Sequence, residues 1–110
     1  MRYIVLFFIG VLASSCTSSK GLYYWGNYET SYYNKVHKPG DESNQAHIKE
    51  LKKIINKTER KSKLRIGPGI YGEYGYYLLQ GGQPDMANDY FIKEKQLFPE
   101  STTTINFISK

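Results

Sequence analysis

Residues 70–82 read Ile-Tyr-Gly-Glu-Tyr-Gly-Tyr-Tyr-Leu-Leu-Gln-Gly-Gly, and this stretch decides the fold. Pro68 lies two residues before it, and we expect this proline in the first turn of a helix, where proline is tolerated. Gly81-Gly82 ends that helix. Gly72 and Gly75 lie inside it and each cost about 1 kcal/mol relative to alanine. The large apolar residues recur at helical spacing and predict one apolar face: Ile70, Tyr71, Tyr74, Tyr77 and Leu78.

Four further helices are predicted around this one. Asn27 can cap a helix that Lys38-Pro39-Gly40 ends, and residues 41–44 offer caps for a second helix. Pro84 opens a helix after the glycine pair, and Pro99 ends it. Ser101 caps a short last helix. No stretch alternates cleanly between apolar and polar residues as a strand does, so the sequence predicts an all-α fold of about five short helices.

The apolar spacing also predicts which side chains of these four helices face inward. Each stripe recurs every three or four residues, as one face of a helix does. We expect these residues on the inner faces: Trp25, Tyr28, Tyr32 and Val36; Ile48, Leu51, Ile55 and Thr58; Ala87, Tyr90, Phe91, Glu94, Leu97 and Phe98; Ile105, Phe107 and Ile108.

The two helices around Gly81-Gly82 resemble one tetratricopeptide repeat. Gly75 and Ala87 stand where two backbones approach closely in that repeat. Glu94 departs from the pattern, which usually has a small residue there, and a buried carboxylate needs a partner. We therefore expect Glu94 to reach a lysine or tyrosine, or to lie at an edge. Seven positions carry the resemblance: Tyr71, Tyr74-Gly75, Leu78, Gly82, Ala87, Phe91 and Pro99.

The first residues read as an export signal that ends in a lipobox-like sequence. Arg2 precedes a ten-residue apolar run, and small residues 13–15 lead to Cys16, the only cysteine of the chain. This order resembles bacterial lipoproteins, in which the cysteine becomes the lipidated N-terminus. The alternative is an ordinary secreted protein with a chance cysteine. We expect a signal peptide over 1–15, a lipidated tether over 16–21 and a single helical domain over 22–110. Thr17 after the cysteine favours the outer membrane. We expect the domain on the periplasmic face of that membrane.

The ends of the domain resemble a family of small bacterial outer-membrane lipoproteins of unknown function. The similarity lies in the entry Leu-Tyr-Tyr-Trp-Gly-Asn-Tyr at 22–28 and in the exit Leu-Phe-Pro-Glu-Ser at 97–101. Genes of that family often stand beside a gene for a CsgG-like curli-assembly lipoprotein. The resemblance therefore implies a role in outer-membrane assembly or secretion, with other envelope lipoproteins as partners, and it implies no enzymatic activity.

Composition excludes several classes of protein. The 110 residues carry a formal charge of +5, and a single cysteine excludes an internal disulfide framework and a multi-cysteine metal site.

Residues 49–65 contain eight basic and two acidic side chains. They form either a solvated face or a contact with anionic lipid, cell wall or an acidic partner. Since an exported protein meets no nucleic acid, we expect no nucleic-acid partner.

We expect no enzyme activity, no cofactor and no small-molecule substrate. The two histidines, His37 and His47, lie ten residues apart around a Pro-Gly turn. They could meet across the first hairpin, but we expect ordinary surface or cap histidines. No lysine-containing phosphate loop accompanies the glycines.

Aromatic residues are the most informative feature for function, since the chain contains eleven tyrosines, five phenylalanines and one tryptophan. These rings either form the core of a small domain or leave some tyrosines outside it to bind a partner. The sequence predicts a small lipid-anchored adaptor in an envelope assembly. The alternative is a module that binds peptidoglycan or another ligand. The partner-binding candidates fall off the apolar stripes: Tyr23, Tyr24, Tyr33 and Tyr76.

Overall fold

A computed structural model describes residues 23–109, so the predicted signal peptide, the predicted tether and Cys16 lie outside the described residues. The predicted all-α class is confirmed. Five α-helices and one short 3-10 helix follow each other in the described part: α2 (Tyr28–His37), α3 (Asp41–Arg60), α4 (Ile70–Gln80), α5 (Pro84–Leu97), the 3-10 helix Pro99–Ser101 and α6 (Thr102–Ile108).

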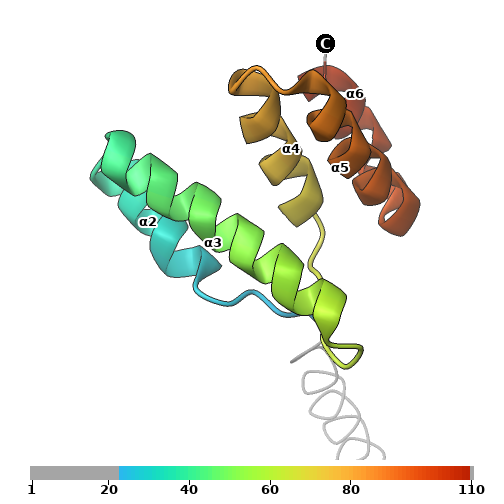
Figure 1. The fold of residues 1–110 in the computed structure, drawn as a ribbon, viewed down its shortest axis with the longest axis horizontal. Helices are drawn as coiled ribbons and strands as arrows, with labels where there is room; N and C mark the ends of the chain where they lie inside the picture. Colours follow the sequence, from blue (N-terminus) through green and yellow to red (C-terminus); the bar gives the residue numbers. More distant parts are fainter. Residues whose placement is uncertain (1–22, 110) are drawn as a thin grey trace, which may run out of the picture.

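The helices are arranged as two hairpins followed by α6 (Figure 1). In the first hairpin, α2 packs along α3, and in the second, α4 packs along α5. Helix α3 also contacts α4, and α6 contacts α5. The 20-residue α3 thus connects the outer helix α2 to the second hairpin.

Two apolar clusters stabilise this arrangement. The larger one joins α3 to α4, and it includes Ile66 from the loop between them. The smaller one joins α5 to α6 through Ala87, Phe91 and Ile105. The predicted stripe of α3 is confirmed in its centre, because Leu51 and Ile55 are buried, and Ile54 beside the stripe is buried too. The remaining buried residues of the larger cluster come from α4: Ile70, Tyr71 and Tyr74.

The two prolines expected to open helices behave differently. Pro84 occupies the first turn of α5, as predicted. Pro68 does not occupy the first turn of α4, which begins at Ile70. Gly69 separates them with a φ of +96°, a left-handed conformation that favours glycine and interrupts the helical path.

The predicted inward face of the first helix is confirmed only for Tyr28, which is half-buried against the larger cluster. No residue of α2 is fully buried, and the expected inner residues Trp25, Tyr32 and Val36 are 41%, 47% and 53% exposed. The reason is tertiary, because α2 is an outer helix that packs mainly on α3. Leu97 and Phe107 were also expected inside, but they are 55% and 77% exposed.

The glycines inside α4 permit close helix packing, as expected for Gly75. A Cβ at Gly75 would lie 2.7 Å from the Phe91 ring and 3.1 Å from the Ala87 carbonyl oxygen. A Cβ at Gly72 would lie 2.7 Å from the Ile105 side chain. The relation of the α4–α5 hairpin to the tetratricopeptide repeat stays a prediction.

Candidate functional site

Glu94 joins α5 to the start of α4, although it is a fully buried carboxylate. Its Oε2 accepts hydrogen bonds from the Gly69 backbone N–H at 3.0 Å and from the Ser101 hydroxyl at 3.0 Å. Its Oε1 accepts one from the Gly72 N–H at 3.2 Å. The first amides of a helix have no partner within the helix and carry partial positive charge. Glu94 therefore caps α4 from a neighbouring helix.

This arrangement corrects two expectations. Glu94 does not reach a lysine or tyrosine and does not lie at an edge, because backbone amides satisfy it. Ser101 precedes α6 but makes no capping hydrogen bond to it, since its hydroxyl donates to Glu94 instead.

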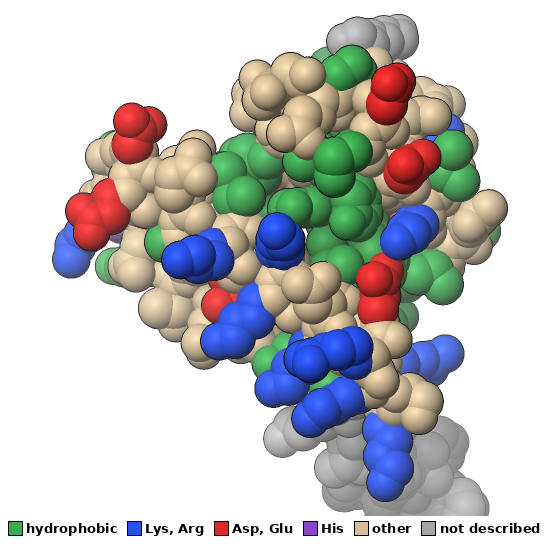
Figure 2. Space-filling view, viewed as in Figure 1, with side chains coloured by type: hydrophobic (Ala, Val, Ile, Leu, Met, Phe, Trp, Pro, Cys, Tyr) green, Lys and Arg blue, Asp and Glu red, His purple; other side chains and the backbone are tan. Residues whose placement is uncertain are grey.

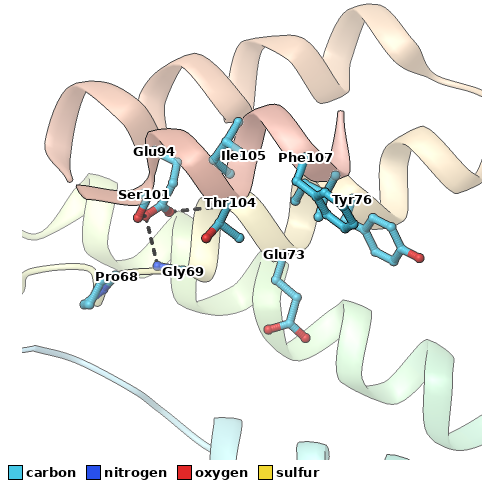
Figure 3. Close-up of a pocket in the computed structure, with 11 residues that line it drawn as sticks. Pro68, Gly69, Glu73, Tyr76, Glu94, Ser101, Thr104, Ile105 and Phe107 are labelled. Carbon is cyan, nitrogen blue, oxygen red and sulfur yellow. Dashed lines mark hydrogen bonds between the residues drawn. The ribbon is translucent and has the colours of Figure 1, made fainter. Parts of the chain in front are cut away.

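A groove of about 730 Å³ lies beside Glu94, between α4 and α6 (Figure 3). We call it the α4–α6 groove. Phe107 of α6 and Tyr76 of α4 both line it and are 77% and 37% exposed. Sequence reasoning missed Phe107 because apolar spacing alone cannot show that nothing covers a helix. The groove is lined by Pro68, Gly69, Gly72, Glu73, Tyr76, Glu94, Ser101, Thr104, Ile105, Phe107 and Ile108.

A second polar cluster connects the two hairpins around His47, which is fully buried. Its Nε2 lies 2.5 Å from Glu73 Oε2 on α4, and its Nδ1 lies 2.8 Å from Ser31 Oγ on α2. Tyr28 donates a hydrogen bond of 2.7 Å from its hydroxyl to Glu73 Oε1. His47 is thus no surface residue. It does not meet His37, whose ring stacks on Tyr33 at 3.9 Å.

The electrostatics of this cluster favour an ionised Glu73. Burial alone raises the pKa of the Glu73 carboxyl, but hydrogen bonds from His47 and Tyr28 outweigh it, and the pKa lies below its usual value. Burial and the contact with Glu73 raise the pKa of the Tyr28 hydroxyl.

The order Ser31–His47–Glu73 is that of a hydrolytic triad. Because His47 is fully buried and the Ser31 hydroxyl also donates to the Tyr28 carbonyl, we interpret it as a structural bridge.

The four tyrosines expected to bind a partner do not form one patch. Tyr23 and Tyr33 are exposed, at 37% and 57%, on the entry segment and on α2. Tyr76 lies in the α4–α6 groove. Tyr24 is half-buried and packs against the larger core cluster, so the expectation that it falls outside the core is wrong. Its backbone forms a parallel bridge with Ile66, which draws the ring inward.

Lysine and arginine side chains gather where α3 ends (Figure 2). We call the five cations of residues 57–65 the basic end. Lys57 lies over the Tyr24 ring, with its Nζ 5.1 Å from the ring centroid. None of the five forms an ion pair within residues 23–109. The basic end consists of Lys57, which is half-buried, and Arg60, Lys61, Lys63 and Arg65, which are exposed.

The described residues contain neither a metal-binding cluster nor a membrane-spanning helix. Among residues 23–109, no group of three or more histidine, cysteine or acidic side chains is placed to hold a metal ion. No helix of that same part of the chain is long and apolar enough to cross a membrane.

Comparison with known proteins places the chain in a family. No curated protein and no solved structure matches it. A family model described as a domain of unknown function, DUF4810, matches residues 22–108, which is most of the chain and includes every helix described above. The chain therefore belongs to the DUF4810 family.

Proposed function

We propose that the protein is a lipid-anchored envelope protein whose helical domain binds another envelope lipoprotein through the α4–α6 groove. The lipid is attached at Cys16 and holds the domain on the periplasmic face of the outer membrane. The observation that carries the proposal is Phe107, a 77% exposed ring on the same apolar groove as Tyr76. Exposed apolar patches of this kind mark interaction sites, and aromatic side chains dominate their binding energy.

The groove is held in one shape before any partner binds. Glu94 connects α5, the start of α4 and Ser101 by three hydrogen bonds. Ile105 anchors α6 in the smaller apolar cluster. A site that needs no ordering on binding retains more of its interaction energy as affinity. This rigidity supports a docking role for the groove.

The lining of the groove indicates the chemistry of the partner. It contains Glu73 and no lysine or arginine among the lining residues that the structure describes. Both carboxylate oxygens of Glu73 are already engaged, by the Tyr28 hydroxyl and by His47, so the free part of the lining is mainly apolar. The apolar face of an amphipathic helix matches this surface.

The decisive experiment is recovery of partners from palmitate-labelled cells after detergent extraction. We expect the wild-type protein to recover a second palmitate-labelled protein and Phe107→Ser to lose most of it. Ile92→Ser is the matched control, since Ile92 is 41% exposed but lies on α5 outside the groove. Equal recovery by Phe107→Ser and Ile92→Ser would place the binding surface elsewhere.

The anchor has its own test. Cys16→Ser removes the only thiol of the chain. We expect this variant to lose both palmitate labelling and lipoprotein-type signal processing. A variant that still incorporates palmitate would refute lipidation at Cys16.

A second candidate function is glycan binding, and a run of ring contacts favours it. Neighbouring centroids lie 6.4 Å apart for Tyr23–Trp25, 5.8 Å for Trp25–Tyr28 and 5.9 Å for Tyr28–Tyr32. Trp25 and Tyr32 are 41% and 47% exposed. Such rings suit stacking on sugars. Retention on purified sacculi that Tyr32→Ser abolishes and Phe107→Ser leaves intact would favour this function over the adaptor.

A further inference from the structure

Tyr24, near the start of the described residues, lies against the basic end. The Tyr24 backbone N–H donates a 2.7 Å hydrogen bond to the Arg65 carbonyl, and Tyr24 pairs with Ile66. Lys57 lies over the Tyr24 ring. The described part of the chain therefore begins beside the basic end.

The covalent length of that preceding chain limits how far the basic end can lie from Cys16. Six residues separate Cys16 from Tyr23, and even a fully extended chain over these seven peptide units spans only about 25 Å. If Cys16 holds the lipid, the basic end lies closer to the membrane surface than most of the domain. This step rests on the anchor in the proposed function.

Charge is concentrated at this one place. Residues 57–65 hold five cations and one carboxylate, Glu59, so their net charge is +4 while the whole chain carries +5. Glu59 pairs with Lys93 at 3.1 Å and accepts a hydrogen bond from the Tyr71 hydroxyl, so it is engaged elsewhere. The described structure therefore neutralises none of the basic end by ion pairs.

Aromatic rings accompany these charges. Trp25, the only tryptophan of the chain, is 41% exposed and packs on Gly67, two residues after Arg65. Tyr23 is 37% exposed and contacts Trp25 edge-on. Tryptophan and tyrosine are enriched at the level of lipid headgroups, where one side of the ring is apolar and the other is wet.

We propose that the basic end is a docking surface for the anionic phospholipid headgroups of the leaflet that holds the lipid anchor. It orients the domain with α3 ending at the membrane and the α4–α6 groove free for a partner. Each cation near an anionic surface raises the ratio of docked to undocked protein roughly five-fold. Removal of three cations therefore lowers the docked-to-undocked ratio on the order of 100-fold.

The test uses the full-length lipidated protein, reconstituted into vesicles of phosphatidylcholine with or without an equal amount of phosphatidylglycerol. Trp25 reports docking through quenching by lipids that carry a nitroxide near the headgroup. We expect stronger quenching in the anionic vesicles. We also expect this additional quenching to disappear at about 1 M salt, where the screening length falls to about 3 Å.

Two triple variants separate local charge from net charge. Lys61→Gln, Lys63→Gln and Arg65→Gln together should abolish the extra quenching. The matched control removes the same number of exposed cations elsewhere and should retain it: Lys38→Gln, Lys49→Gln and Lys52→Gln.

Three outcomes would overturn the inference. Equal quenching in both vesicle types, or equal loss in both triple variants, would assign the basic end to solvent or to an acidic protein. Quenching of the wild-type protein that does not change with salt would also contradict docking on anionic lipid, and this result needs no variant. Absence of palmitate on the purified protein would remove the anchor, whereas loss of partner recovery alone would contradict only the adaptor.

Discussion

Replacement of Glu94 by glutamine tests whether a buried carboxylate holds the second hairpin together. The side chain keeps its size, so no cavity forms. One of its two oxygens becomes an NH2 group, which cannot accept the hydrogen bond that Gly69 or Gly72 donates. The start of α4 then loses a charged acceptor, and two donors face each other in a buried place.

The expected cost follows from these contacts. A hydrogen bond to a charged group contributes about 1.5–3 kcal/mol, and a buried donor left without an acceptor costs about 1–3 kcal/mol. We expect Glu94→Gln to lower the free energy of unfolding by about 2–4 kcal/mol. This is a large part of the roughly 4–13 kcal/mol that a domain of this length has. The melting temperature should fall by roughly 10–30 °C.

Thermal unfolding of the mature chain in detergent, followed by far-UV circular dichroism, measures this change. Glu100→Gln is the matched control, because Glu100 is an exposed carboxylate next to Ser101 and should leave the melting temperature unchanged. Ser101→Ala removes one of the three hydrogen bonds and should cost about 1 kcal/mol. If Glu94→Gln melts within a few degrees of the wild type, the carboxylate does not stabilise the start of α4.

Two further predictions concern packing and pH. Gly75→Leu places a branched side chain where even a Cβ lies 2.7 Å from the Phe91 ring, so we expect a loss of about 1–3 kcal/mol or more in urea unfolding; an unchanged midpoint would contradict close packing of α4 on α5. The folded state holds the pKa of Glu73 below the usual 4.5, so the stability that its ionised form contributes is complete above that pH and is lost as the pH falls further. The melting temperature of the wild type should therefore fall more steeply below about pH 4.5 than that of Glu73→Gln, and parallel curves would show that the contact with His47 adds nothing.

Local chemistry determined most of the helix boundaries. The expected proline start of α5 and the Pro39-Gly40 stop before α3 are confirmed, because such signals act within one or two residues. The expected caps are wrong: Asn27 makes no side-chain capping hydrogen bond to α2, and residues 41–44 lie within α3, which follows Gly40. Gly75 was also predicted correctly as a packing position. The prediction that Pro68 lies in the first turn of α4 was wrong, because the start of this helix depends on the backbone conformation of Gly69.

The sequence by itself determined that the chain is all-α and where its α-helices lie, because apolar periodicity and caps act over a few residues. Only the tertiary structure decided which faces are covered and which polar groups are paired. Phe107 follows a helical stripe yet remains exposed, since no other element covers it in the described structure. Glu94 is paired with amides 22 and 25 residues away, and His47 with Glu73, 26 residues away. Such partners meet only after the hairpins pack, so spacing along one helix could not reveal them.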